Sequence, residues 1–307
     1  MAEGPEHDLD SGVLAVLASE QDSSSTLQRV VELQQLLARH WWTFARFGLT
    51  PQKLAARALN RTEPKILCNS LPKAGTHLLE RALCLHPRLY RKFVPTISDQ
   101  KIHRWNGLDP LLARVRPGQI VLCHLHFKPE YRQSMAECGI RSIFLIRDPR
   151  DVVVSQAFYI AGEKRHPLHQ LFARQPSLKE RLKIAIQGDA AHGLPSVGQR
   201  LDEFGGWLGA SDLVVRFEDL IGAEGGGSMR SQREALRALY FAVGLSPQEE
   251  LLDSITQQLF SSASPTFRRG RTGEWRECFD LELQELFQYT AADQLVRYGY
   301  SDTRSVG

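Results

Sequence analysis

The sequence lacks the features that mark secreted, zinc-binding and membrane-spanning proteins. Its five cysteines are an odd number, widely spaced, and never form a C-x-x-C pair, which argues against a disulfide framework and a zinc knuckle. No set of histidines, cysteines and carboxylates has the spacing of metal ligands. The N-terminus has no basic segment before an apolar run, and no stretch of about 18 apolar residues occurs. We therefore expect a soluble protein of the reducing cytoplasm that binds no metal.

Basic residues are absent from the first 28 positions, which contain six acidic residues. The whole chain has 38 Lys and Arg against 35 Asp and Glu, a net charge of +3. Residues 29–307 therefore hold 38 basic and 29 acidic residues, a net charge of +9. This excess favours anionic ligands. It does not indicate nucleic-acid binding, because the arginines fall in separate loops rather than along one stripe.

Three parts follow one another along the chain. Residues 1–25 mix acids, glycine and a serine run, which is typical of a loosely held acidic tail. Residues 26–48 have apolar side chains at helical spacing and predict an amphipathic helix. Its aromatic end, residues 39–47, packs on the following domain or contacts a membrane surface; packing is the simpler interpretation. Residues 60–307 form the remaining domain.

Short apolar runs alternate with helical segments from residue 65 onward. Strands are predicted over 65–69, 119–124, 142–146 and 213–217, and helices over 76–85, 149–159, 178–186 and 201–208. This alternation is typical of a three-layer α/β fold with a central parallel sheet flanked by helices. The glycine-rich segment 222–228 follows the fourth strand and is interpreted as a tolerated insertion rather than a binding element.

A loop with phosphate-binding features joins the first predicted strand to the first helix. It reads L-P-K-A-G-T-H-L over residues 71–78. A helix N-terminus offers unpaired N–H groups, Gly75 lets the backbone approach a phosphate, and Lys73 adds a positive charge. The loop is not a Walker A motif, because Lys73 precedes a single glycine. Taken alone, it could equally be an ordinary turn.

A second motif, R-D-P-R-D-V-V-V-S over residues 147–155, follows the third predicted strand. Arg147 stands at the carboxyl end of that strand, where open α/β sheets bind ligands. Together with the hydroxyl of Ser155, its guanidinium can grip one phosphate from two sides. The alternative is a salt-bridged helix start, in which Arg147 and Arg150 pair with Asp148 and Asp151.

A third motif, F-R-R-G-R-T-G-E-W-R over residues 267–276, has four arginines and two glycines in ten residues. Such a loop cradles anions through guanidinium and backbone N–H groups, or it is a solvated basic turn.

Two histidines, His124 and His126, stand at the end of the second predicted strand. Residues i and i+2 of a strand share a face, so either could point into the ligand crevice. An imidazole suits the work of a general base. For a lone histidine at a strand end, a surface or supporting role is the simpler interpretation. Whether one of these two histidines is a general base therefore depends on the neighbouring motifs.

Together the motifs resemble those of the sulfotransferases that use 3′-phosphoadenosine 5′-phosphosulfate (PAPS). The loop at 71–78 is similar to P-K-[SA]-G-T-T-W, with His77 and Leu78 in place of Thr and Trp. Residues 147–155 match R-D-P-[RK]-D-x-x-x-S without a departure. Residues 268–276 are similar to R-K-G-x-x-G-D-W-[KR], with Arg for Lys and Glu for Asp. The resemblance covers roughly residues 65–305 and implies a P-loop-like sulfotransferase domain over residues 60–307.

The resemblance also implies roles for individual residues. His124 aligns with the family's catalytic histidine, with His126 as the alternative base, and Lys73 supplies positive charge for the transition state. Phe217 replaces the Tyr of a Y-E-D-[LM] string and faces the adenine or belongs to the core. The residues implied to bind PAPS are Lys73, Ala74, Gly75, Thr76, His77, Leu78, Arg147, Ser155, Phe217, Arg268, Arg269 and Gly270.

The implied reaction transfers a sulfuryl group from PAPS to a hydroxyl or amine of a small-molecule, sugar or lipid acceptor. It releases adenosine 3′,5′-bisphosphate (PAP) and needs no metal. A nucleotide-dependent kinase stays an alternative, although it would need a Walker lysine and an acidic Mg²⁺ ligand. A non-catalytic nucleotide-binding relative is a second one. A homodimer through residues 276–285 is a further expectation, because the charged ends of that segment resemble the family's K-x-x-x-T-V-x-x-x-E segment.

Overall fold

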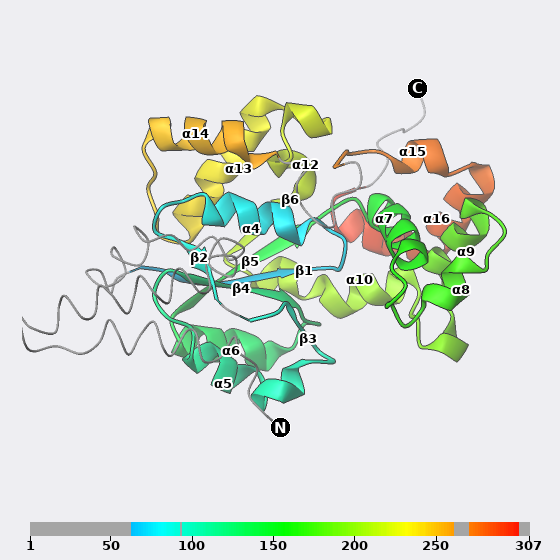
Figure 1. Ribbon diagram of the computed structural model, residues 1–307, viewed down its shortest axis with the longest axis horizontal. Helices are drawn as coiled ribbons and strands as arrows, with labels where there is room; N and C mark the ends of the chain where they lie inside the picture. Colours follow the sequence, from blue (N-terminus) through cyan, green and yellow to red (C-terminus); the bar gives the residue numbers. More distant parts are fainter. Residues whose placement is uncertain (1–62, 93, 261–269, 301–307) are drawn as a thin grey trace, which may run out of the picture.

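The computed structural model describes residues 63–92, 94–260 and 270–300, and Figure 1 shows their arrangement. The strands are β1 (Lys65–Ser70), β2 (Tyr90–Arg91), β3 (Ile97–Ser98), β4 (Gln119–His124), β5 (Ile140–Ile146) and β6 (Leu213–Arg216). The α-helices are α4 (Thr76–Cys84), α5 (Leu108–Ala113), α6 (Pro129–Glu137), α7 (Pro149–Gly162), α8 (His169–Ala173), α9 (Leu178–Gln187), α10 (Val197–Gly205), α11 (Trp207–Ala210), α12 (Phe217–Leu220), α13 (Met229–Ala242), α14 (Glu249–Leu259), α15 (Trp275–Cys278) and α16 (Leu281–Arg297). Short 3₁₀ turns are η1 (Ile102–Trp105), η2 (Ala190–His192) and η3 (Ala223–Gly225).

The strands form one six-stranded sheet in the order β2-β4-β1-β5-β6, with β3 also paired to β4. Every pairing is parallel. The short strands β2 and β3 follow each other along β4, since β2 pairs with its start and β3 with its end. Parallel neighbours need crossover connections, which the helices between the strands provide. The predicted α/β fold with a central parallel sheet is confirmed.

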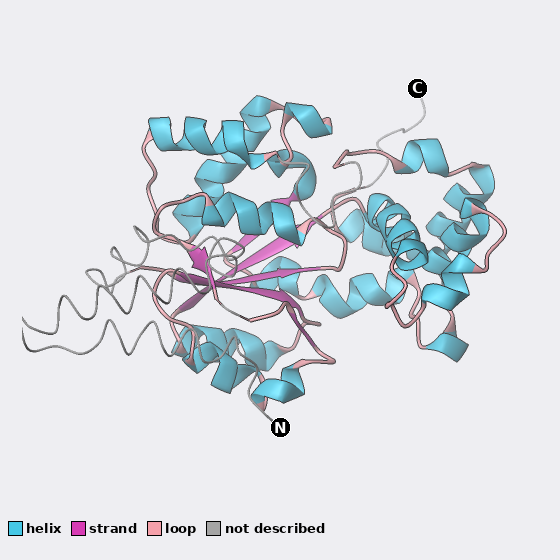
Figure 2. Ribbon diagram, viewed as in Figure 1, coloured by secondary structure: helices cyan, strands magenta, loops and turns pink. Residues whose placement is uncertain are grey.

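Alternate residues of each strand face two separate hydrophobic clusters. On β1, Ile66 and Cys68 pack with residues of α4, α13 and α14, whereas Leu67 packs with residues of α5, α6 and α10. Figure 2 shows the corresponding helices on the two sides of the sheet. Each fully buried aliphatic side chain contributes about 1.5–3 kcal/mol through removal of apolar area from water. The two clusters thus stabilise both faces of the sheet, and the loops at its strand ends are available for ligand binding.

The predicted helix over 201–208 is two helices, α10 and α11. Gly206, with a φ of −63° and a ψ of −25°, stands between them. A Cβ at this position would lie 2.0 Å from Cδ1 of Phe127, so the close approach of this ring requires glycine. Helix α10 also begins earlier than predicted, at a capping box in which Ser196 and Gln199 bond each other's backbone N–H groups. The fourth predicted strand is one residue too long, since Phe217 already begins α12.

Several predictions concern residues outside the described ranges. These are the acidic tail 1–25, the amphipathic helix 26–48 with its aromatic end 39–47, and the arginines Arg268 and Arg269. Within the described ranges, no helix is long and apolar enough to cross a membrane. No disulfide joins the five cysteines, all of which lie in those ranges.

Candidate functional site

The predicted site residues gather at the carboxyl ends of neighbouring strands. The loop with Lys73 follows β1, His124 ends β4, Arg147 follows β5, and Phe217 follows β6. Since β4, β1, β5 and β6 are parallel neighbours in this order, their carboxyl ends meet at one edge of the sheet. Ligands of open α/β sheets bind at this edge.

The loop before α4 has an unusual backbone. Lys73 has a positive φ of 73° and Gly75 one of 108°, a region that costs most non-glycine residues about 1 kcal/mol or more. Gly75 caps α4 without any side-chain hydrogen bond. The first N–H groups of a helix have no intrahelical acceptor and carry the positive end of its dipole. The loop thus presents backbone donors at Thr76 and His77 beside the Lys73 side chain, as an anion site requires.

Phe217 packs directly onto this loop. A Cβ at Gly75 would lie 2.4 Å from Cδ2 of Phe217, and the Arg147 guanidinium lies 4.4 Å from the centre of the same ring. Phe217 is only 4% exposed. The buried ring therefore packs against both the loop and the guanidinium, and a contact with the adenine stays a prediction.

The Lys73 ammonium lies over the ring of Tyr159, 3.8 Å from its centre. Tyr159 belongs to α7 and is 37% exposed. Ser155, the predicted phosphate ligand, lies one helical turn earlier and so on the same face of α7. Tyr159 was not predicted from the sequence, although its spacing of four residues from Ser155 is that of neighbours on one helix face.

Ser70 connects the loop to His124. Its hydroxyl lies 2.7 Å from Oγ1 of Thr76, and its carbonyl oxygen lies 2.8 Å from Nδ1 of His124. A carbonyl oxygen only accepts, so Nδ1 of His124 carries the proton and Nε2 keeps a lone pair. Ser70, which the sequence analysis did not identify, therefore fixes the tautomer that a general base needs.

The environment keeps the His124 imidazole neutral. Burial, with smaller contributions from the charges of His77, Lys101 and Lys73, lowers the pKa of His124 to about 4. The hydrogen bond to Ser70 acts in the opposite direction and is outweighed. At neutral pH this side chain is an acceptor of protons rather than a donor.

His126 lies in a different environment. Its Nδ1 is 3.6 Å from a carboxylate oxygen of Asp99, and its Nε2 is 3.3 Å from one of Glu203. The ring also contacts the edge of Phe204 and is about half-buried. Both ring nitrogens thus face carboxylates, whereas His124 contacts the strand end that leads into the Lys73 loop.

Arg147 is held from several sides and is 8% exposed. Its Nη2 donates to the carbonyl oxygen of Arg271 at 2.8 Å and lies 3.7 Å from Oδ2 of Asp151. Its Nη1 approaches the carbonyl oxygen of Lys73 at 3.5 Å. The Nε N–H is buried and has no hydrogen-bond partner among the described residues. A buried guanidinium N–H without a partner is costly, and a bound anion would satisfy it.

Arg150 forms the salt-bridged helix start that was the alternative for this motif. Its Nε and Nη2 donate to the two carboxylate oxygens of Asp148 at 3.0 and 2.8 Å. The guanidinium also stacks on Trp275, 3.8 Å from the ring centre. The salt-bridged helix start is thus present for both arginines, since Arg147 lies near Asp151 and Arg150 pairs with Asp148. Of the two, only Arg147 also contacts the Lys73 loop, and its binding of a phosphate stays a prediction.

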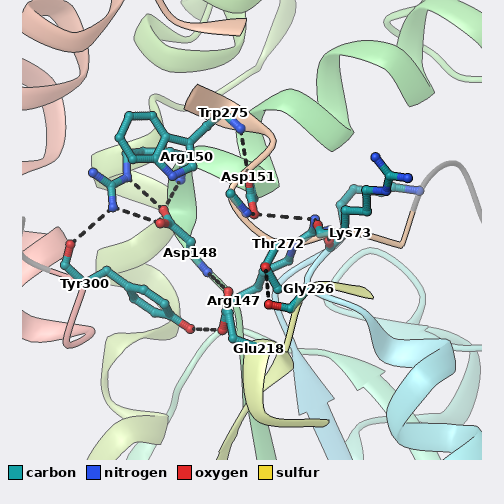
Figure 3. Close-up of polar contacts among 12 residues, drawn as sticks. Lys73, Arg147, Asp148, Arg150, Asp151, Glu218, Gly226, Thr272, Trp275 and Tyr300 are labelled. Atoms are coloured by element: carbon teal, nitrogen blue, oxygen red, sulfur yellow. Dashed lines mark hydrogen bonds and ion pairs between the residues drawn. The ribbon is translucent and has the colours of Figure 1, made fainter. Parts of the chain in front are cut away.

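The carboxylates of Asp151, which is buried, and of Glu218, which is partly buried, tie distant segments to this region, as Figure 3 shows. Asp151 accepts from the backbone N–H groups of Gly273 and Trp275 at 2.8 and 2.9 Å. Glu218 accepts from the backbone of Asp148 at 2.9 Å and from the hydroxyl of Tyr300 at 2.7 Å. Burial raises the pKa of both carboxyls, and for Asp151 the Arg147 charge acts in the opposite direction. The basic C-terminal loop is thereby fastened to the start of α7.

The arrangement suits a polyanionic ligand. Lys73, the N-terminus of α4 and the partnerless Nε of Arg147 offer positive charge and donors at one sheet edge. Gly270 begins the described part of the basic loop with a positive φ of 58°. No cluster of three or more His, Cys, Asp or Glu side chains within the described ranges is arranged to hold a metal ion.

Comparison with known proteins finds relatives by sequence and, separately, solved structures with a similar fold. No family model matches the chain. The chain is 22% identical over 248 residues to Sulfotransferase 2A6 of Mus musculus, which covers 74% of this chain and 82% of that protein. It is 21% identical over 250 residues to 3-alpha-hydroxysteroid sulfotransferase of Cavia porcellus, with the same two coverages.

Two solved structures with a similar fold both contain PAP. The mouse sulfotransferase SULT7A1 complexed with PAP matches with a TM-score of 0.55 and 16% identity, covering 82% of this chain and 94% of that one. Retinol dehydratase in complex with retinol and PAP matches with a TM-score of 0.51 and 16% identity, covering 84% and 88%. The chain therefore has the fold of the sulfotransferases, and its resemblance to the PAPS-dependent members is confirmed in sequence and in architecture.

Proposed function

We propose that this protein is a PAPS-dependent sulfotransferase. The observation that carries the proposal is the position of Ser70, which contacts both His124 and Thr76 and so places a neutral imidazole beside the Lys73 loop. A base and an anion-binding loop joined by one residue match the needs of group transfer from an anionic donor. The sulfotransferase relatives and the PAP-bound solved neighbours support this choice of donor.

PAPS supplies an activated sulfuryl group and leaves as PAP. On this proposal the 5′-phosphosulfate is bound by the Lys73 ammonium and by backbone N–H groups between Ala74 and His77, of which that of Ala74 already donates to the carbonyl oxygen of Leu71. Arg147 and Ser155 bind the 3′-phosphate together with Gly270. A phosphate oxygen satisfies the buried Nε of Arg147. Arg268 and Arg269, outside the described residues, stay predicted contributors to the same phosphate.

His124 acts as the general base on this proposal. Its Nδ1–H donates to Ser70, so Nε2 accepts the proton of the acceptor hydroxyl while the oxygen attacks sulfur in line with the leaving phosphate. Lys73 neutralises the charge that develops on the leaving oxygen. Negative charge of the bound donor raises the pKa of His124 from about 4 toward neutrality, which strengthens it as a base in the complex.

We propose a small apolar alcohol as the acceptor. The name of the Cavia porcellus relative points to 3-alpha-hydroxysteroids, and two structures of retinol dehydratase contain androsterone or retinol. A cytoplasmic location and a homodimer through the start of α16 belong to the same proposal. Analytical ultracentrifugation of the full chain tests the dimer, which substitution of Leu281, 76% exposed at this start, should weaken.

Acceptor screening by mass spectrometry tests the function. The full chain is incubated with PAPS and a panel of sterols, retinoids, phenols, sugars and lipids. We expect one class to gain the mass of a single SO₃ group, with release of PAP. Lys73→Ala and His124→Ala serve as site controls and should lose this product, while Gly209→Ala, an exposed change with nothing within 4 Å, should keep it. Equal product from His124→Ala and the parent would reject His124 as the base and favour His126.

A further inference from the structure

The glycine-rich loop after β6 packs against the described part of the basic C-terminal loop. The backbone N–H of Thr272 donates to the carbonyl oxygen of Gly225 at 3.0 Å. The Thr272 hydroxyl donates to the carbonyl oxygen of Gly226 at 3.4 Å, as Figure 3 shows. One backbone–backbone hydrogen bond and one side-chain–backbone hydrogen bond therefore join two segments that are distant in the chain.

Successive positions of this loop admit only glycine. A Cβ at Gly225 would lie 2.1 Å from Cγ1 of Ile221 and 2.6 Å from the carbonyl oxygen of Gly270. Gly226 has a φ of 88°, and a Cβ at Gly227 would lie 2.7 Å from the carbonyl oxygen of Glu218. The run interpreted above as a tolerated insertion is thus a closely packed surface, since any side chain at Gly225 would push the loops apart.

Arg271, the residue before Thr272, connects the packed loops to Arg147 in the proposed nucleotide site. The carbonyl oxygen of Arg271 accepts from Nη2 of Arg147 at 2.8 Å. On the far side of Thr272, the N–H of Gly273 donates to Asp151, which also lies 3.7 Å from Arg147. The position of the Arg271 carbonyl, and with it the orientation of the guanidinium, therefore depends on where Thr272 is held.

We propose that Gly225 and Thr272 are positioning residues for Arg147. The glycine loop holds Thr272, Thr272 fixes the Arg271 carbonyl, and that carbonyl orients the guanidinium with its Nε N–H left for the 3′-phosphate. This inference rests on the proposed function, because it takes Arg147 as the ligand of that phosphate. Preorganisation of a long side chain removes part of the entropic cost of binding. Its loss should weaken 3′-phosphate recognition about tenfold.

Calorimetric titration with PAP and with adenosine 5′-monophosphate (AMP) tests the inference, because only PAP carries a 3′-phosphate. The variants are Gly225→Ala and the isosteric Thr272→Val, which removes only the hydroxyl bond to Gly226. We expect the ratio of the AMP and PAP dissociation constants to fall about tenfold in Gly225→Ala and about threefold in Thr272→Val. A role confined to fold stability would instead weaken both ligands equally.

Gly209→Ala on α11 is the matched control and should keep the ratio of the parent, because a Cβ there meets nothing within 4 Å. If Gly225→Ala fails to fold, Thr272→Val decides the question. A parental ratio in Thr272→Val, or in a folded Gly225→Ala, would overturn the inference. A parent protein that binds PAP no better than AMP would instead reject the proposed PAPS site itself.

Discussion

The ammonium of Lys73 and the ring of Tyr159 form a cation–π pair, with Nζ 3.8 Å from the ring centre. The pair joins the loop before α4 to α7, the helix that the Arg147 motif begins. A cation–π contact at a partly exposed site contributes about 0.5–1 kcal/mol. It therefore holds Lys73 at the site and still allows the ammonium to turn toward a bound anion.

Removal of the Lys73 charge should cost activity far more than stability. We expect Lys73→Ala to lower kcat about 100-fold, because a preorganised charge aimed at the leaving oxygen is lost. The free energy of unfolding should fall by no more than about 1 kcal/mol, the value of the pair with Tyr159. Steady-state turnover of PAPS and urea unfolding measure the two quantities. Lys183→Ala is the control, since Lys183 pairs with Glu180 and Glu282 on exposed surface; a comparable kcat loss there would contradict a specific role of Lys73.

The pKa of about 4 for His124 predicts a pH profile. Only the neutral imidazole accepts a proton, so kcat/KM should be flat near neutrality and fall about tenfold per pH unit below that pKa. Fold stability should also drop as the pH falls from about 6.5 to about 4, because the unfolded chain binds this proton more readily.

Histidine ring nitrogen NMR at neutral pH gives an independent reading of the same group. The expected spectrum shows His124 protonated on Nδ1, since Ser70 accepts there. His124→Gln is the control for the stability component and should lose less stability over this pH range than the parent. A protonated Nε2 with a bare Nδ1 would disagree with the hydrogen bond to Ser70 and with the base assigned here.

Arg147 and Arg150 should respond differently to the same substitution. Arg147→Gln should weaken PAP about 10–100-fold and leave AMP unchanged, because charge-assisted bonds to one phosphate are lost. Arg150→Gln leaves Asp148 buried without its cation and should lower the free energy of unfolding by about 3 kcal/mol. Titration calorimetry and denaturant unfolding of both variants check this contrast. Equal losses of PAP affinity in the two folded variants would argue against separate roles.

Gly75 and Gly193 provide a matched pair for the loop before α4. Both have a left-handed backbone, with φ and ψ of 108° and 29° at Gly75 and of 68° and 26° at Gly193. A Cβ at Gly75 would meet Phe217, whereas one at Gly193 would meet nothing within 4 Å. Both alanine variants carry left-handed backbone strain, so the difference in stability chiefly measures overpacking. We expect Gly75→Ala to be less stable than Gly193→Ala by about 1–3 kcal/mol. Equal unfolding free energies would mean that the Phe217 ring moves aside without cost.

The alternation of apolar runs and helical segments predicted most of the fold. Strand β4 was predicted with its observed bounds, and β1 and β6 to within one residue. The two-residue strands β2 and β3 could not be predicted, because two residues show no periodicity. The break between α10 and α11 falls at Gly206, whose backbone angles are helical, so the local sequence pattern did not indicate it.

The motifs predicted the strand ends that form the site but not the contacts between them. Lys73, His124 and Arg147 were predicted from their motifs together with the resemblance to the sulfotransferases, and their roles stay predictions. Ser70 contacts His124 through its backbone carbonyl, and every residue has one, so the sequence contains no signal for this contact. The packing of Gly225 against Gly270 could not be predicted from the sequence either, because it depends on how two distant loops meet.

Thermal unfolding of the full chain with PAP, and separately with ATP, tests the central claim most directly. A PAPS site predicts that PAP raises the unfolding temperature at micromolar concentration, since a ligand that binds only the folded state stabilises it. ATP lacks the 3′-phosphate for Arg147 and should stabilise far less. Stabilisation by ATP with no response to PAP would contradict the sulfotransferase proposal and favour a nucleotide-dependent kinase.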